Sequence, residues 1–135
     1  MVRACYFGPL GERSFGANRG TDYNALIADK AGYYREANEQ MLVCALLEDA
    51  AVLDNLDAIL SVPGIDLYSI GPNDFAQSVG YPGEPDHPEV VKTMQEISRR
   101  IRQAGRTMQA DVMQAAWVSD MLLDAGGRIL SERGR

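Results

Sequence analysis

The feature that most constrains the fold is an alternation of apolar runs of strand length with segments of helical period. The runs 41–48 and 65–70 are apolar at most positions. A segment whose apolar residues recur at helical spacing follows the first run. Such alternation predicts βα units arranged around a parallel sheet, and therefore an α/β fold. Because the first run is apolar at successive positions, we expect it to be buried on both faces, with Cys44 inside.

The clearest helix begins at Pro88 and ends before Gly105, which suit a helix start and a helix stop. One apolar stripe runs along it, formed by Val90, Met94, Ile97, Ile101 and Ala104. Its C-terminal half is rich in arginine, which complements the helix dipole. Further helices are predicted over 23–39, 49–60, 75–79 and 118–125, the last closed by Gly126-Gly127.

Two shorter strands complete the predicted order, one over 107–112 and one starting at 128–130. Residues 1–22 are punctuated by glycine and are predicted to form an entry loop, so that the βα units occupy 23–135 of a single domain. Arg13 in this loop is expected to brace it rather than to bind an anion. Trp117 is expected to pack beside the last helical stripe.

Two carboxylates end the two apolar runs. Glu48 directly follows the first run, and Asp74 lies in the turn 70–75 that follows the second. Because functional groups of α/β folds lie at the carboxyl ends of parallel strands, two neighbouring strands that end in acids could share one divalent cation. The alternatives are that Asp74 caps the helix beginning at Phe75 and that Glu48 is a solvated strand end.

Composition excludes several classes of function. The 135 residues carry a net charge of −6, which argues against nucleic acid as the main partner. No apolar run approaches the roughly 20 residues of a membrane span, and no signal peptide is evident, so we expect a cytoplasmic protein without membrane contact. One histidine, His87, and two distant cysteines exclude the usual zinc clusters. His87 and Tyr81 are expected to pack within a loop.

Five stretches of the chain, four of them in close succession, resemble the HpcH/HpaI aldolase family, which is related to citrate lyase. The chain reads Val-Pro-Gly-Ile-Asp at 62–66 and Ile-Gly-Pro-Asn-Asp-Phe at 70–75, which is followed by Ser-Val-Gly-Tyr-Pro-Gly at 78–83. His-Pro-Glu-Val follows at 87–90, and Gly-Pro-Leu-Gly-Glu-Arg at 8–13 is similar to a family loop. The close match spans about residues 41–106.

The resemblance implies a fold, a cofactor and a reaction. The family is built on a TIM-type (β/α)8 barrel and uses Mg²⁺ or Mn²⁺, whose two carboxylate ligands correspond to Glu48 and Asp74. The turn residues Gly71, Pro72 and Asn73 are implied to contact the substrate. The implied reaction is aldolase-like carbon–carbon cleavage of a 2-oxo acid through a metal-bound pyruvate enolate.

The chain also departs from the family pattern. It resembles only the C-terminal half of the barrel, and it has no counterpart of the family's catalytic arginine and histidine, so its catalytic residues stay unassigned. Leu46 stands where the family has glutamine. An open half-barrel exposes sheet edges and apolar surface, which predicts a homo-oligomer. The alternatives to a lyase are a catalytically impaired binding or assembly subunit and a repurposed biosynthetic enzyme.

Overall fold

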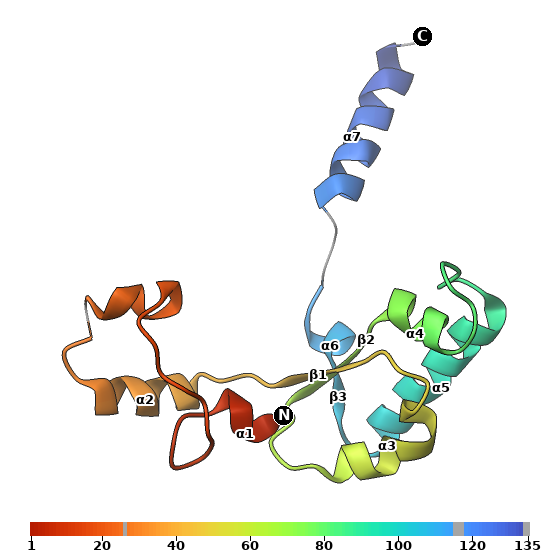
Figure 1. Ribbon diagram of the computed structural model, residues 1–135. Helices are drawn as coiled ribbons and strands as arrows, with labels where there is room; N and C mark the ends of the chain where they lie inside the picture. The colour runs from red at the N-terminus through yellow and green to blue at the C-terminus, as the bar shows by residue number, and fades with distance from the viewer. Residues whose placement is uncertain (26, 115–117, 134–135) are drawn as a thin grey trace.

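The computed structural model describes residues 1–25, 27–114 and 118–133 (Figure 1). Three strands form its sheet: β1 (Cys44–Leu47), β2 (Leu67–Ile70) and β3 (Thr107–Met108). The helices of the described ranges are α1 (Val2–Cys5), η1 (Arg19–Asn24), α2 (Lys30–Glu39), α3 (Val52–Ser61), α4 (Pro72–Ser78), α5 (Pro88–Gln103), α6 (Gln109–Val112) and α7 (Val118–Arg133).

The sheet is parallel, with the strand order β1-β2-β3. The register pairs Leu47 with Ile70 at the carboxyl ends of β1 and β2, and Tyr68 with Met108 across β2 and β3. Helix α3 connects the first two strands, and α4 and α5 connect the second and third. The α/β class and the parallel sheet predicted from the alternation are therefore confirmed.

The main core lies between one face of the sheet and the helices α3, α4 and α5. Tyr68 and Phe75 are its largest fully buried side chains. The predicted stripe of α5 supplies Val90, Ile97 and Ile101, whereas Ala104 is exposed beyond the end of the helix. Arg100 of α5 pairs with Asp57 of α3, and Arg106, which follows α5, donates to the Leu60 carbonyl of α3 over 2.7 Å.

At β1 the opposite face of the sheet is exposed, which corrects the prediction that the first run is buried on both sides. Along β1, Ala45 and Leu47 are buried, while Cys44 and Leu46 are exposed. The physical reason is that α3 and α5 both pack on the side that Ala45 and Leu47 face. In a barrel of the TIM type, this second face would be the interior.

The N-terminal segment forms its own aromatic cluster, in which Phe7 stacks on Tyr34 with ring centroids 4.4 Å apart. Asn38 secures the contact: its side chain accepts a hydrogen bond from the Phe7 N–H and donates one to the Phe7 carbonyl.

The prediction of a loop over 1–22 was partly wrong, because this segment contains α1 and the start of η1. The helix predicted over 23–39 starts only at Lys30, since Tyr23 and Asn24 adopt positive φ angles. Leu26 lies outside the described residues.

The chain after β3 turns at once into a helix, so the strand predicted over 107–112 was wrong beyond Met108. Asp111 explains the change. Its carboxylate accepts the Met108 N–H at the start of α6 and pairs with Arg102 over 2.7 Å. A side chain that satisfies backbone donors at a helix start competes with continued strand pairing.

The same contacts predict a pH effect. Hydrogen bonds from Arg102 lower the pKa of Asp111 below its ordinary value. The carboxylate therefore stabilises the fold above the pKa it has in the unfolded chain, about 4, and this stabilisation is lost as the pH falls through the lower folded-state value. Urea unfolding of an Arg102→Gln variant should show a weaker loss of stability on acidification than the unaltered chain. Parallel acid profiles for the two proteins would contradict this assignment.

Helix α7 differs most from expectation. It runs through Gly126 and Gly127, where a stop was predicted, and it includes 128–130, where a strand was predicted. A strand requires a hydrogen-bonding neighbour, and Figure 1 shows α7 projecting away from the sheet formed by the described strands. Trp117 lies outside the described residues. In the part of the chain that the structure describes, no helix is long and apolar enough to cross a bilayer.

Candidate metal centre

The carboxyl ends of β1 and β2 bring the two predicted acids to one edge of the sheet. Since the register pairs Leu47 with Ile70, the residues that follow, Glu48 and Gly71, lie opposite each other. The Gly71 N–H donates to the Leu47 carbonyl over 3.1 Å and extends the ladder by one bond. Glu48 is thus positioned directly beside the turn that carries Asp74.

Asp74 lies in the first turn of α4, which begins at Pro72 with Gly71 as its N-cap. Proline suits this position because the first helical N–H needs no partner within the helix. The Phe75 N–H bonds to the Gly71 carbonyl over 2.9 Å, so Asp74 does not cap it, and the capping alternative is wrong. A carboxylate in the first turn is also favoured by the helix dipole.

The side chain of Glu48 lies against Gly71. A methyl group placed on Gly71 would lie 3.0 Å from Glu48 Oε2 and 3.2 Å from Glu48 Cβ. Such distances are closer than ordinary van der Waals contact, so the glycine provides the space that the glutamate occupies. The sequence alone did not indicate that Gly71 makes room for Glu48. The signal for it would have been a glycine that lies opposite an acid in the strand register.

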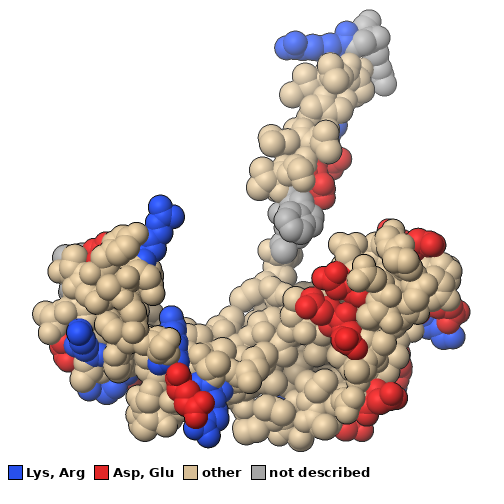
Figure 2. Space-filling view, in the orientation of Figure 1, with Lys and Arg blue, Asp and Glu red and all other residues tan. Residues whose placement is uncertain are grey.

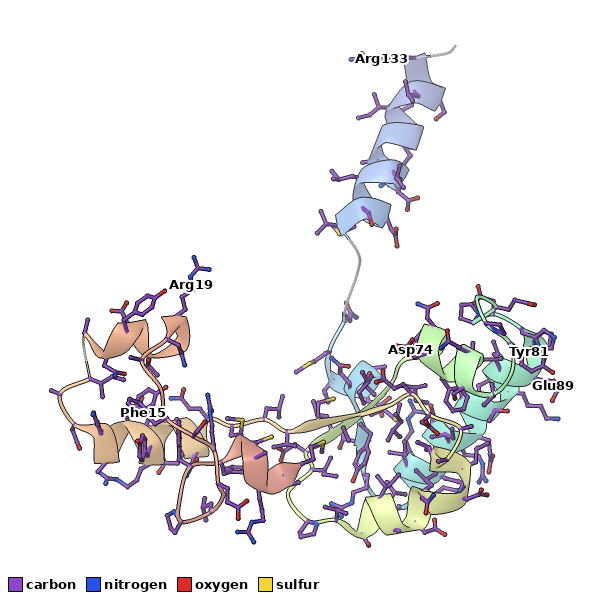
Figure 3. The ribbon with its side chains drawn as sticks, viewed as in Figure 1. Phe15, Arg19, Asp74, Tyr81, Glu89 and Arg133 are labelled. Carbon is purple, nitrogen blue, oxygen red and sulfur yellow. The ribbon has the colours of Figure 1, made fainter. Side chains whose placement is uncertain are left out.

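Both carboxylates are exposed, and within the described ranges neither has a hydrogen-bond or ion-pair partner. Figure 3 shows Asp74 where the chain leaves the sheet and enters α4, and Figure 2 shows acidic side chains gathered over this region. Two unpartnered carboxylates that follow neighbouring strands at one sheet edge favour a cation near them.

This donor set fits a hard divalent cation. Mg²⁺ is commonly held by one or two carboxylates, with water and substrate oxygens completing its coordination. Among the described residues, no group of three or more His, Cys, Asp or Glu side chains could hold a metal ion. The arrangement thus suits a cation shared with a substrate rather than one enclosed by protein ligands.

An apolar side chain also borders Gly71. Leu46 is 55% exposed, and its Cδ1 lies 3.6 Å from the position of a methyl group on Gly71. Cys44 lies on the same face of β1, and partial desolvation raises the pKa of its thiol. A thiol with a raised pKa is a poor nucleophile at neutral pH, so Cys44 does not suit covalent catalysis.

The other residues considered from the sequence lie away from this edge. The guanidinium of Arg13 lies 4.7 Å from the centroid of the Phe7 ring, so Arg13 braces the N-terminal segment as predicted. Tyr81 and His87 stack with ring centroids 3.9 Å apart, as expected for loop packing. His87 Nδ1 also accepts the Glu89 N–H at the start of α5.

An alanine at position 71 is predicted to disturb the site while sparing the fold. The backbone angles of Gly71, φ −85° and ψ 97°, are allowed for alanine, so the added methyl group acts mainly through its contact with Glu48. We expect Mn²⁺ affinity, measured by calorimetry, to fall about tenfold, with less than about 1 kcal/mol of stability lost. In a Glu48→Ala background the same substitution should have no further effect on affinity; an equal effect in both backgrounds would show that Glu48 is not involved.

Comparison with known proteins places these residues in a family context. A family model described as HpcH/HpaI aldolase/citrate lyase matches residues 3–128. A 2-keto-3-deoxy-L-rhamnonate aldolase of Klebsiella pneumoniae is 40% identical over 106 residues, which are 78% of this chain and 39% of that protein. A 4-hydroxy-2-oxovalerate aldolase of Rhodococcus jostii is 41% identical over 106 residues, or 78% and 40% of the two chains.

The fold is also shared with a solved structure. An HpcH/HpaI aldolase/citrate lyase family protein of Burkholderia cenocepacia superposes with a TM-score of 0.78 at 25% identity, covering 99% of this chain and 59% of that one. The chain therefore has the architecture of part of a TIM-type barrel. It spans about two fifths of the length of the curated relatives that it matches.

Proposed function

The chain belongs to the HpcH/HpaI aldolase/citrate lyase family, and on that basis we propose that it performs metal-dependent, aldolase-like cleavage of a 2-oxo acid. The proposed cation ligands are Glu48 and Asp74, and the proposed ion is Mg²⁺ or Mn²⁺. The single observation that carries the proposal is the position of Glu48, packed against the Gly71 turn at the strand edge from which Asp74 projects.

The bound cation would supply Lewis-acid stabilisation of the negative charge that develops on substrate oxygen as the carbon–carbon bond breaks. Glu48 and Asp74 would fix the ion at the sheet edge, since both come from positions held by the strand register and by the buried Phe75. Their two charges also make the site selective for cations before any substrate binds.

The turn 71–73 is proposed to contact the substrate. The Gly71 N–H is already committed to Leu47, and Pro72 has no N–H, so Asn73 is the member of the turn best able to donate a hydrogen bond. Gly71 and Pro72 would then contribute shape rather than donors. Leu46, whose side chain also lies beside Gly71, would present an apolar contact where the family has a polar one.

A small 2-oxo acid such as pyruvate is the proposed ligand, and a homo-oligomer is the proposed assembly. The exposed face of the sheet supports the assembly, because Leu46 and Cys44 would be covered in a closed barrel. A second candidate function, binding or assembly without catalysis, is favoured by Leu46, since an apolar side chain cannot replace a hydrogen bond to the substrate.

The test is pyruvate release from 4-hydroxy-2-oxovalerate and from 2-keto-3-deoxy-L-rhamnonate, measured with added Mn²⁺. We expect turnover by the unaltered chain and a loss of at least about 100-fold in the Glu48→Ala and Asp74→Ala variants. Equal turnover by all three proteins would refute the proposed site. Absent turnover together with weak or absent Mn²⁺ binding would favour the second candidate, whereas a tight Mn²⁺ site that is lost in Asp74→Ala would count against it.

A further inference from the structure

Asp66 ends the stretch Val-Pro-Gly-Ile-Asp at 62–66 and lies at the amino end of β2, the end opposite to the proposed metal site. Its carboxylate oxygen Oδ2 accepts the Val43 N–H over 2.8 Å. The Asp66 N–H in turn donates to the Val43 carbonyl over 2.9 Å. Val43 is 3% exposed, so its N–H depends on a partner from the protein. Asp66 thus binds both backbone groups of the residue that directly precedes β1.

The turn before β2 holds Asp66 in this position. Gly64 adopts a φ angle of 78°, in the left-handed region that glycine occupies without strain, and the chain turns there after α3. Ile65 is buried and joins the main core. Asp66 therefore lies between a buried anchor and Leu67, the first residue of β2, and from there its carboxylate reaches the start of β1.

The apolar pattern of β1 does not by itself select a register. Ala45 and Leu47 face the core, but the exposed positions Cys44 and Leu46 are apolar as well. A strand that slips by one residue exchanges the two sets, and burial discriminates weakly when both sets are apolar. A polar contact at a fixed point discriminates better, because a slip of one residue, about 3.3 Å, carries a donor beyond the reach of its acceptor.

We propose that Asp66 sets the register of β1 against β2 and is in this way a positioning residue for Glu48. The register found in the structure places Glu48 opposite Gly71, the glycine that leaves room for its side chain. A shift of one residue would put Leu47 or Asp49 opposite Gly71 instead. The inference rests on the proposed function only in taking Glu48 as a ligand of the cation.

Asp66 acts through the strand rather than through its own charge. Glu48 lies five positions after Val43, which corresponds to about 16 Å of strand. At an ionic strength of 0.1 M, exposed charges at this separation are largely screened, since the Debye length is about 10 Å. The carboxylate therefore contributes as a hydrogen-bond acceptor, and asparagine can replace it because its side-chain carbonyl is also an acceptor.

The test compares Asp66→Ala with Asp66→Asn, which both remove the charge but differ in the acceptor. Hydrogen exchange followed by NMR reports on the register without metal, through the Gly71 N–H, which donates to Leu47 at the far end of the strand pair. In Asp66→Ala, the Gly71 amide should exchange at least about 10-fold faster relative to the Ile101 amide of α5. In Asp66→Asn, this ratio should stay within about twofold of its value in the unaltered chain.

Calorimetry with Mn²⁺ measures the consequence for the proposed site. Asp66→Ala should weaken binding about tenfold, and Asp66→Asn should keep the affinity of the unaltered chain. Ile97→Val, a substitution in the core face of α5, is the control for a general loss of stability. It should change the exchange of Gly71 and Ile101 together and leave the Mn²⁺ affinity unchanged.

Equal behaviour of the alanine and asparagine variants, or a Gly71 exchange ratio that Asp66→Ala leaves unchanged, would overturn the proposal. A raised ratio with unaltered Mn²⁺ affinity would also overturn it, because the register would then not position Glu48. An unaltered chain that binds no Mn²⁺ would refute the proposed function instead, and the exchange ratios would still decide whether Asp66 sets the register. If circular dichroism shows that Asp66→Ala does not fold, Asp66→Ser takes its place, since the serine hydroxyl is one bond shorter than the carboxylate.

Discussion

Replacing Asp74 with asparagine is expected to weaken Mn²⁺ binding at least about 100-fold, because one of two charged oxygen ligands is lost. Asp74 is exposed and has no hydrogen-bond partner among the described residues, so stability should change by less than about 0.5 kcal/mol. Isothermal calorimetry measures the affinity, and urea unfolding measures the stability.

Asp54→Asn is the matched control for this experiment. Asp54 is also an exposed acid in the first turn of a helix, α3, as Asp74 is in α4. The Asp54→Asn variant should bind Mn²⁺ with the same affinity as the unaltered chain. If the two variants weaken binding equally, the effect is one of general charge, and the assignment of Asp74 as a ligand fails.

The second large effect is expected from Phe75→Ala. The Phe75 side chain is fully buried and anchors α4, and with it Asp74, to the main core. Removal of a buried phenylalanine ring costs about 3–5 kcal/mol, which is a large part of the stability of a small domain. We expect a corresponding fall in the urea midpoint and a loss of Mn²⁺ binding under conditions where the chain unfolds.

Gln77→Ala provides the comparison on the same helix, since Gln77 is exposed. The free energy of unfolding of the Gln77→Ala variant should stay within about 0.5 kcal/mol of that of the unaltered chain. A Phe75→Ala protein as stable as Gln77→Ala would mean that α4 is not held by the core, and the rigid placement of Asp74 would have to be abandoned.

The elements that sequence patterns predicted well are those whose partners lie nearby in the chain. Helix α5 has one long apolar stripe and clear ends, and three of its five predicted stripe residues are fully buried. The apolar runs before Glu48 and Asp74 form neighbouring parallel strands, so the shared edge was predictable from the order of βα units.

The features that were missed depend on contacts that no local pattern encodes. Strand β3 stops at Met108 because Asp111 pairs with Arg102, nine residues earlier in the chain. The expected last strand is helical, and among the described residues no strand lies beside it. The close approach of Glu48 to Gly71 arises from register, which sets side chains opposite one another only after the sheet has formed.

The claim that Glu48 and Asp74 support enolate chemistry is tested most directly by proton exchange at pyruvate. In deuterium oxide with Mn²⁺, NMR follows the replacement of the pyruvate methyl protons, which requires enolisation but no second substrate. We predict that the unaltered chain accelerates this exchange above the rate with Mn²⁺ alone, and that Asp74→Asn and Glu48→Gln abolish the acceleration. Exchange at the rate of Mn²⁺ alone, or equal acceleration by all three proteins, would contradict the account.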